Sequence, residues 1–115
     1  MKQFLLAASL LTLIGTQASA GFLTNRQEWN NASHNQKAGF VQGVFAEMVM
    51  NWTTDSKTTT DLKAKLHICV VDMKLTDLAL VDVVDSHYTD LEQWADPANI
   101  ALRIGLLKVC NLYEG

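Results

Sequence analysis

Residues 33–52 read SHNQKAGFVQGVFAEMVMNW, and this stretch decides the fold class. Ser33 is followed three residues later by Gln36, which is the spacing of a capping box at the start of a helix. The apolar side chains then recur every three or four residues, which is the period of an amphipathic helix and not that of a strand. The face predicted to turn inward comprises Phe40, Val41, Val44, Phe45, Met48 and Trp52.

Two glycines, Gly39 and Gly43, lie four residues apart on this predicted helix. Each glycine costs a helix about 1 kcal/mol relative to alanine, so the pair calls for a compensating interaction. Close approach of a neighbouring helix is the simplest such interaction. That neighbour is either another helix of the same chain or, in a homodimer, a helix of a second copy.

Helical spacing extends over the remainder of the chain, and the hairpin signals Asn-Gly and Asp-Gly are absent. The polar run TTDSKTTT at 53–60 predicts a connection between helices. The sequence therefore predicts an all-α fold, a compact bundle of four to five short helices stapled by one disulfide. Besides the helix already described, we expect one helix from Thr24 to about Asn30 and another from Thr60 or Asp61 to about Met73. A further helix is expected to begin at a Thr76 cap and to end between Tyr88 and Trp94. The last helix is expected to begin at an Asp96 cap, with Pro97 at the first helical position, and to end at about Tyr113.

Each of these helices has a predicted inward face. In the first one, Trp29 is expected to turn toward the core. Asp82 and Asp85 are expected to face water. The other inward faces are expected to carry Leu62, Leu66, Cys69, Val70 and Met73; then Leu80, Val81, Val84, Tyr88 and Leu91; and finally Ile100, Ala101, Ile104, Leu107 and Cys110.

The first twenty residues, MKQFLLAASLLTLIGTQASA, have the pattern of a cleavable signal peptide. Lys2 supplies the positive start, Phe4 to Ile14 is a short apolar run, and Ala18-Ser19-Ala20 supplies the small residues before the cleavage site. We therefore expect cleavage after Ala20, export to the periplasm, and a single helical domain over residues 21–115. The mature chain is not expected to bind a membrane.

Cys69 and Cys110 are the two cysteines of the chain. Two cysteines in a small exported domain favour a disulfide, and a metal site would need more ligands than this distant pair offers. The bridge would close a loop of about 40 residues, for which the chain-entropy model gives roughly 4 kcal/mol of stabilisation.

Charge and residue pattern narrow the range of functions. The formal net charge is −3, and loss of Lys2 with the signal peptide makes it −4, so a nucleic acid is a poor partner. The three histidines, His34, His67 and His87, lie far apart in sequence and predict no catalytic pair. We therefore expect a binding protein and not an enzyme, with no cofactor and no metal.

Three stretches of the mature chain carry a family resemblance. They are 36–44 (QKAGFVQGV), His67-Ile68-Cys69 followed by 75–78 (LTDL), and Trp94-Ala95-Asp96-Pro97 with the final helix that ends on Cys110. In this order they resemble the Rap/Tai family, the periplasmic immunity proteins of type VI secretion amidase effectors. The resemblance implies that the chain binds a cognate peptidoglycan amidase effector in the periplasm and blocks its active-site cleft without chemistry.

Two polar segments are candidates for the partner-binding surface, because loops on a rigid scaffold carry function. Residues 51–60 contain Asp55, and residues 86–96 contain Tyr88, Asp90, Glu92 and Trp94, a mixture of aromatic and acidic side chains suited to an anchor with a charged rim. In the competing interpretation, Tyr88, Leu91 and Trp94 only close the core beneath the loop.

A second functional class also fits a small, exported, helical chain with one disulfide. Ala38-Gly39-Phe40 is similar to the first helix of the HdeA-like periplasmic acid-stress chaperones, although their disulfide starts before that helix. Such a chaperone loses structure in acid and then suppresses the aggregation of other proteins.

Overall fold

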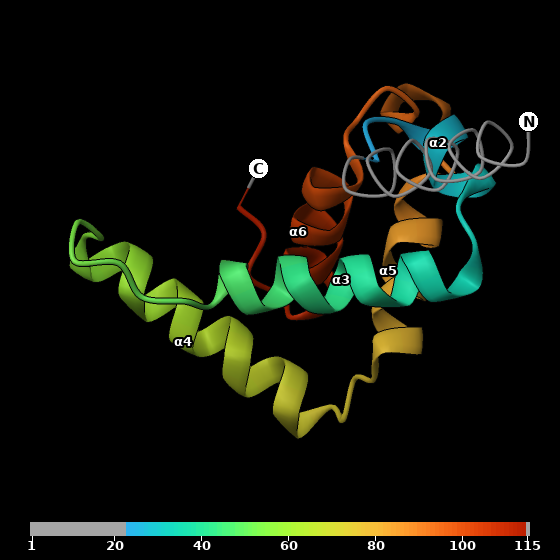
Figure 1. Cartoon of the computed structure of the whole chain (residues 1–115). Helices are drawn as coiled ribbons and strands as arrows, with labels where there is room; N and C mark the ends of the chain where they lie inside the picture. Colours follow the sequence, from blue (N-terminus) through green and yellow to red (C-terminus); the bar gives the residue numbers. More distant parts are fainter. Residues whose placement is uncertain (1–22, 115) are drawn as a thin grey trace, which may run out of the picture.

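The computed structural model describes residues 23–114, and the predicted signal peptide therefore lies outside the described residues. Within this range the regular structure is entirely helical (Figure 1). This confirms the predicted all-α class. The elements in chain order are α2 (Arg26–Asn31), α3 (His34–Met48), α4 (Lys57–Asp72), α5 (Asp77–His87), the 3-10 turn η1 (Leu91–Gln93) and α6 (Ala98–Val109).

Local capping fixes several of the helix starts. Ser33 accepts a hydrogen bond from the Gln36 amide, and the Gln36 side chain accepts one from the Ser33 amide, so the predicted capping box is present. Thr76 caps α5 as predicted. The structure corrects the start of the first helix, expected at Thr24 as its cap: Asn25 caps α2, and the helix begins at Arg26.

Two further helix starts differ from the prediction. Ser56 caps α4 through the Thr59 amide, so this helix begins at Lys57, earlier than the predicted Thr60 or Asp61. The predicted Asp96 cap of the last helix is wrong: Pro97 holds the N-cap position and makes no side-chain cap bond. The carboxylate of Asp96 is instead directed to a buried histidine described below.

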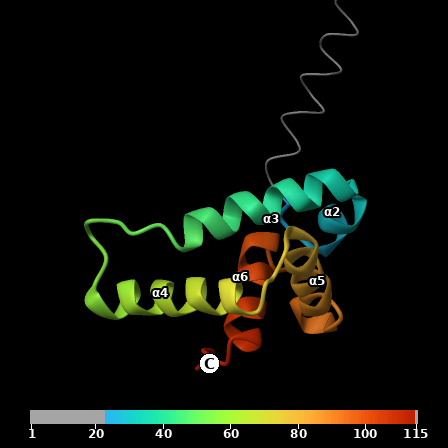
Figure 2. The ribbon, with the colours of Figure 1, turned by 90° about the horizontal axis from the view of Figure 1, so that it is seen from below.

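The core lies where α5 and α6 pack against each other and against α3 (Figures 1 and 2). Trp29 from α2 is fully buried, as predicted, and its indole Nε1 donates a 2.7 Å hydrogen bond to Asp85 Oδ1. Asp85 is therefore exposed but tied to the core. The buried apolar residues are Leu23, Trp29, Val41, Leu66, Val70, Leu80, Val81, Val84, Tyr88, Ala98, Ala101, Leu102 and Leu106.

The inward face of the last helix matches the prediction only in part: Ala101 is fully buried as predicted, but the face is rotated from the predicted one. Leu102 and Leu106 are fully buried, whereas Ile104 and Leu107 are only partly buried. Apolar side chains lie on several faces of this helix, so the helical spacing of apolar residues does not single out one face as the buried one. Three other residues that were expected in the core, Trp52, Met73 and Leu91, are exposed. Each lies beyond the end of the helix whose inward face it was expected to extend.

The glycines on α3 do not have the predicted neighbour. A Cβ placed on Gly39 or Gly43 would meet no atom within 4 Å, so the expected close approach within the chain is wrong. The close approach occurs at Gly105 on α6 instead, where a Cβ would lie 2.5 Å from Val83 Cγ1 and 3.3 Å from the Val83 carbonyl oxygen on α5. Gly105 therefore permits the tight packing of α5 against α6.

Helix α4 extends away from the bundle formed by α3, α5 and α6 (Figure 2). Its buried residues are Leu66 and Val70 in its C-terminal half, and its first turns are polar. The predicted disulfide is present: Cys69 on α4 is bonded to Cys110 at the end of α6, with a Cα–Cα distance of 5.9 Å. A narrow apolar stripe and one covalent bond thus hold the C-terminal half of this helix.

Candidate functional site

The segment after α5 contains most of the predicted partner-binding residues, and its two aromatic residues have structural roles. Tyr88 is buried, and its hydroxyl donates a 2.5 Å hydrogen bond to the Asp96 carbonyl oxygen. The Trp94 indole Nε1 donates to the Tyr88 carbonyl oxygen at 3.0 Å. These bonds fold the loop back onto itself, as the core-closing interpretation predicts for Tyr88.

Three other predicted side chains of this loop, Asp90, Glu92 and Trp94, are exposed at the surface. Asp90 accepts a hydrogen bond from the Glu92 amide and so caps η1, while both side chains remain at the surface. Trp94 is 41% exposed, and the guanidinium of Arg26 stacks over its ring at 4.1 Å. Tyr88 is therefore too deep to contact a partner directly, whereas Asp90, Glu92 and Trp94 remain accessible.

Asp55, the other predicted residue, lies far from this loop. It belongs to the connection between α3 and α4, at the opposite end of the molecule from the 88–97 segment (Figures 1 and 2). Its carboxylate is 2.6 Å from Lys63 Nζ and also accepts a hydrogen bond from the Trp52 amide. The Lys63 hydrogen bond, followed by the Trp52 amide, holds the pKa of Asp55 below its ordinary value of 3.8. The five predicted residues thus do not form one site.

A polar contact between a buried histidine and a partly exposed carboxylate joins α5 to the start of α6, and the sequence did not suggest it. His87 Nε2 lies 2.8 Å from Asp96 Oδ2, and the histidine side chain is only 3% exposed. The two residues are nine positions apart, which matches no helical spacing. Together with the Tyr88 hydroxyl bond, this contact fixes the turn that leads into α6.

Burial and the Asp96 carboxylate raise the pKa of Tyr88 to about 12 from its ordinary value of 10.0. An unfolded chain releases this proton near 10.0, whereas the folded protein retains it to about 12, so the stabilisation is present below pH 10.0 and is lost as the pH rises through the folded pKa. We expect the free energy of unfolding, measured by urea titration, to fall across this window. Tyr88→Phe should remove this dependence. Tyr113→Phe, at an exposed ring, should retain it, and a Tyr88→Phe profile that still falls in parallel with wild type would contradict the assignment.

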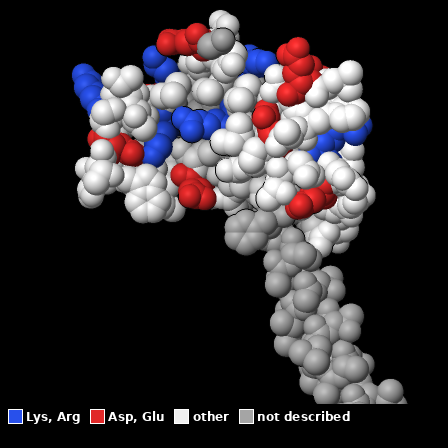
Figure 3. Space-filling model, turned by 90° about the horizontal axis from the view of Figure 1, so that it is seen from above, with Lys and Arg blue, Asp and Glu red and all other residues white. Residues whose placement is uncertain are grey.

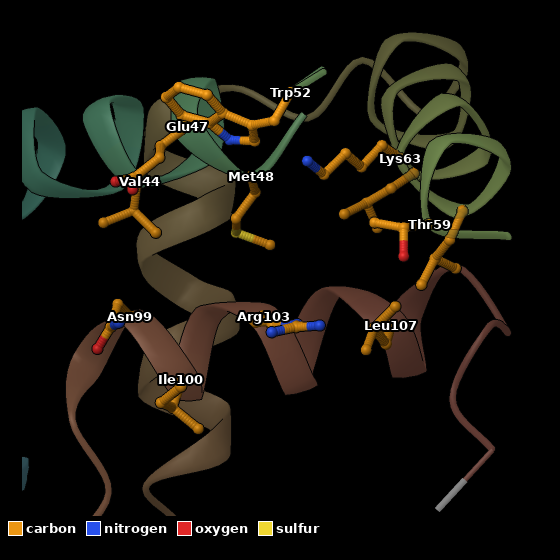
Figure 4. A pocket seen from close by; sticks show the side chains of 12 residues that line it. Val44, Glu47, Met48, Trp52, Thr59, Lys63, Asn99, Ile100, Arg103 and Leu107 are labelled. Carbon is orange, nitrogen blue, oxygen red and sulfur yellow. The ribbon is translucent and has the colours of Figure 1, made fainter. Parts of the chain in front are cut away.

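A groove of about 380 Å³ lies between α3, α4 and α6 (Figure 4). It exists because α4 diverges from the bundle, so apolar side chains that were expected to close a core face an open space instead. Figure 4 shows Met48 directed into this space from α3, with Ile100 and Leu107 on the α6 side. The remaining lining residues are Val44, Glu47, Trp52, Thr59, Leu62, Lys63, Leu66, Asn99 and Arg103.

Hydrogen bonds from Lys63 hold the connection between α3 and α4 at one rim of the groove. Lys63 Nζ donates to the Met50 carbonyl oxygen at 2.7 Å in addition to its ion pair with Asp55. Met50 and Trp52 beside it are 49% and 55% exposed. Large apolar side chains are therefore displayed on a connection that is held in place by hydrogen bonds.

Charge on the groove walls is divided between two helices. Glu47 lies on α3 and Arg103 on α6, both exposed, and neither forms an ion pair with another residue of the range 23–114. Lys63 is already neutralised by Asp55. Figure 3 shows acidic and basic side chains interspersed on the face that it presents.

Comparison with protein-family models, with curated proteins and with solved structures returns no match for this chain. Among the residues that the structure describes, no group of three or more His, Cys, Asp or Glu side chains is arranged to hold a metal ion. None of the helices in that same range has the length and apolarity needed to cross a membrane.

Proposed function

We propose that this chain is a periplasmic immunity protein, which binds a peptidoglycan amidase effector of a type VI secretion system and occludes its active site. The sequence resemblance to the Rap/Tai family supports this proposal, as do the predicted signal peptide and the acidic mature chain. An acidic inhibitor gains association rate toward a basic partner through electrostatic steering. Protection in this account needs binding only, and no reaction.

The groove between α3, α4 and α6 is the observation that carries the proposal. Tryptophan and other large apolar side chains beside a pocket are the usual energetic centre of a protein interface, and charged groups form its rim. Here Trp52 and Met50 are exposed next to an apolar groove whose walls bear Glu47 and Arg103. This arrangement suits recognition of a protein surface.

Preorganisation of the connection between α3 and α4 suits tight binding. Asp55 accepts the Trp52 amide hydrogen and binds Lys63, and Lys63 in turn binds the Met50 carbonyl. A segment that is already ordered pays less conformational entropy when it binds than a mobile loop does. The exposed Trp52 can thus act as an anchor without first being ordered.

The test is inhibition of a candidate amidase by the mature, oxidised chain. The probe is the amidase encoded beside this gene, assayed on purified peptidoglycan, with binding measured by calorimetry. We expect a stable complex with a Kd below about 1 μM and loss of hydrolysis at equimolar ratio. Absence of both, together with suppression of client aggregation in acid by the same preparation, would replace the immunity proposal with the HdeA-like chaperone alternative.

A further inference from the structure

We propose that the groove between α3, α4 and α6 is the docking site for an amphipathic segment of the partner protein. This segment inserts apolar side chains into the groove, places a carboxylate against Arg103 and places a cationic group against Glu47. The inference rests on the proposed function, since it takes the occupant to be part of the inhibited amidase. It adds the chemistry that the occupant must have.

The interior of the groove sets the apolar part of this requirement. Val44 and Met48 on α3, Leu62 on α4, and Ile100 and Leu107 on α6 are all partly buried side chains on its lining. A cavity of about 150 Å³ accommodates a benzene ring, so 380 Å³ has room for about two groups of that size. One or two leucine or aromatic side chains of a partner would fill it.

The charged residues on the groove walls determine which charges the bound segment must carry. Arg103 and Glu47 stand on different helices that border the groove, and each lacks an ionic partner within residues 23–114 (Figure 4). A purely anionic amphiphile would be attracted by Arg103 and repelled by Glu47. A protein segment with one acidic and one basic residue on either side of its apolar face satisfies both walls and is bound in one orientation.

The width of the groove is fixed before binding. At one end, the Asp55–Lys63 ion pair ties the start of α4 to the connection that follows α3. At the other end, the disulfide ties Cys69 of α4 to Cys110 after α6. Lys63 also donates a hydrogen bond to the Met50 carbonyl oxygen just after α3, so α4 is linked to both other walls and the occupant meets a preformed surface.

Charge reversal on each wall tests the proposal in the mature, oxidised chain. Arg103→Glu and Glu47→Lys should each raise the Kd for the amidase by at least about tenfold. The matched controls are Lys108→Glu on α6 and Asp82→Lys on α5, which change the net charge equally at exposed positions outside the groove. These controls should change the Kd by less than about threefold, and circular dichroism and free-thiol counts establish that every variant is folded.

The outcomes separate the groove from the function. A wild-type complex that both groove variants retain at unchanged Kd would overturn the docking site and leave the immunity proposal standing. A wild-type chain that binds no amidase would end the immunity proposal itself. Dodecanoate that fills the groove without displacing the amidase would show that the amidase binds elsewhere, and this result would also overturn the docking site.

Discussion

Replacing both cysteines with serine, Cys69→Ser and Cys110→Ser, should lower the free energy of unfolding by about 4 kcal/mol. The disulfide closes a loop between residues 41 positions apart, and opening that loop returns conformational entropy to the unfolded chain. A domain of this size has about 5–15 kcal/mol in total, so the change is a large share of it. Helix α4 should lose the most stability, because Leu66 and Val70 are its only buried side chains.

Urea titration and hydrogen exchange together measure this effect. We expect the amide protons of α4 to lose protection before those of α3, α5 and α6, since the bond joins α4 to the bundle. Wild-type protein treated with reductant is the matched control and should behave like the double variant. A loss of stability below about 1 kcal/mol, with α4 still protected, would show that the packing of α4 does not need the bond.

Gly105→Ala should destabilise the fold, whereas alanine at either glycine of α3 should stabilise it. The added Cβ at Gly105 would lie 2.5 Å from Val83 Cγ1 and 3.3 Å from the Val83 carbonyl oxygen. Valine in a helix has essentially one favourable rotamer, so the α5–α6 contact has to widen. Such overpacking costs about 1–3 kcal/mol, of which the better helix propensity of alanine returns less than about 1 kcal/mol.

Gly39→Ala and Gly43→Ala are the matched controls, because neither new methyl group would meet an atom within 4 Å. Each should raise the free energy of unfolding by about 0.5–1 kcal/mol through helix propensity alone. Thermal and urea unfolding of the three single variants measure both signs. Equal stabilisation by alanine at all three positions would contradict the tight contact at Gly105, and destabilisation at Gly39 or Gly43 would indicate a neighbour that this fold does not supply.

Local chemistry explains why much of the fold is predictable from the sequence. The Ser33–Gln36 capping box and the Thr76 cap depend on side chains three residues from their partners, and both are present. The helical class and the Cys69–Cys110 pairing follow from apolar spacing and from the presence of only two cysteines. In each of these cases few alternatives compete.

Tertiary packing explains the differences. The first turns of α4 do not pack on the core, so they carry no apolar stripe. The sequence before Thr60 therefore did not indicate that a helix begins at Lys57 with Ser56 as its cap. On α6, apolar residues occupy several faces, and contact with α5 selects Leu102 and Leu106. Asp96 has the sequence pattern of a cap, but a buried histidine nine residues away engages its carboxylate instead.

The candidate site was predictable only in part for the same reason. Sequence identified Asp90, Glu92 and Trp94 on one loop and Asp55 on another, and all four are at or near the surface. The groove depends on the direction in which α4 leaves the bundle, and no residue pattern within that helix encodes this direction. Apolar spacing identifies most of the residues that line the groove, but it predicts that they close a core.

A protection assay in cells tests the central claim most directly. Cells that direct the cognate amidase to their own periplasm receive either the full chain or a chain lacking residues 1–20, expressed at equal levels. The immunity account predicts that the full chain restores growth and that the chain without its signal does not, although the oxidised mature domain binds the amidase in vitro. Equal protection by the unexported chain, or lysis of cells that export a binding-competent domain, would contradict it.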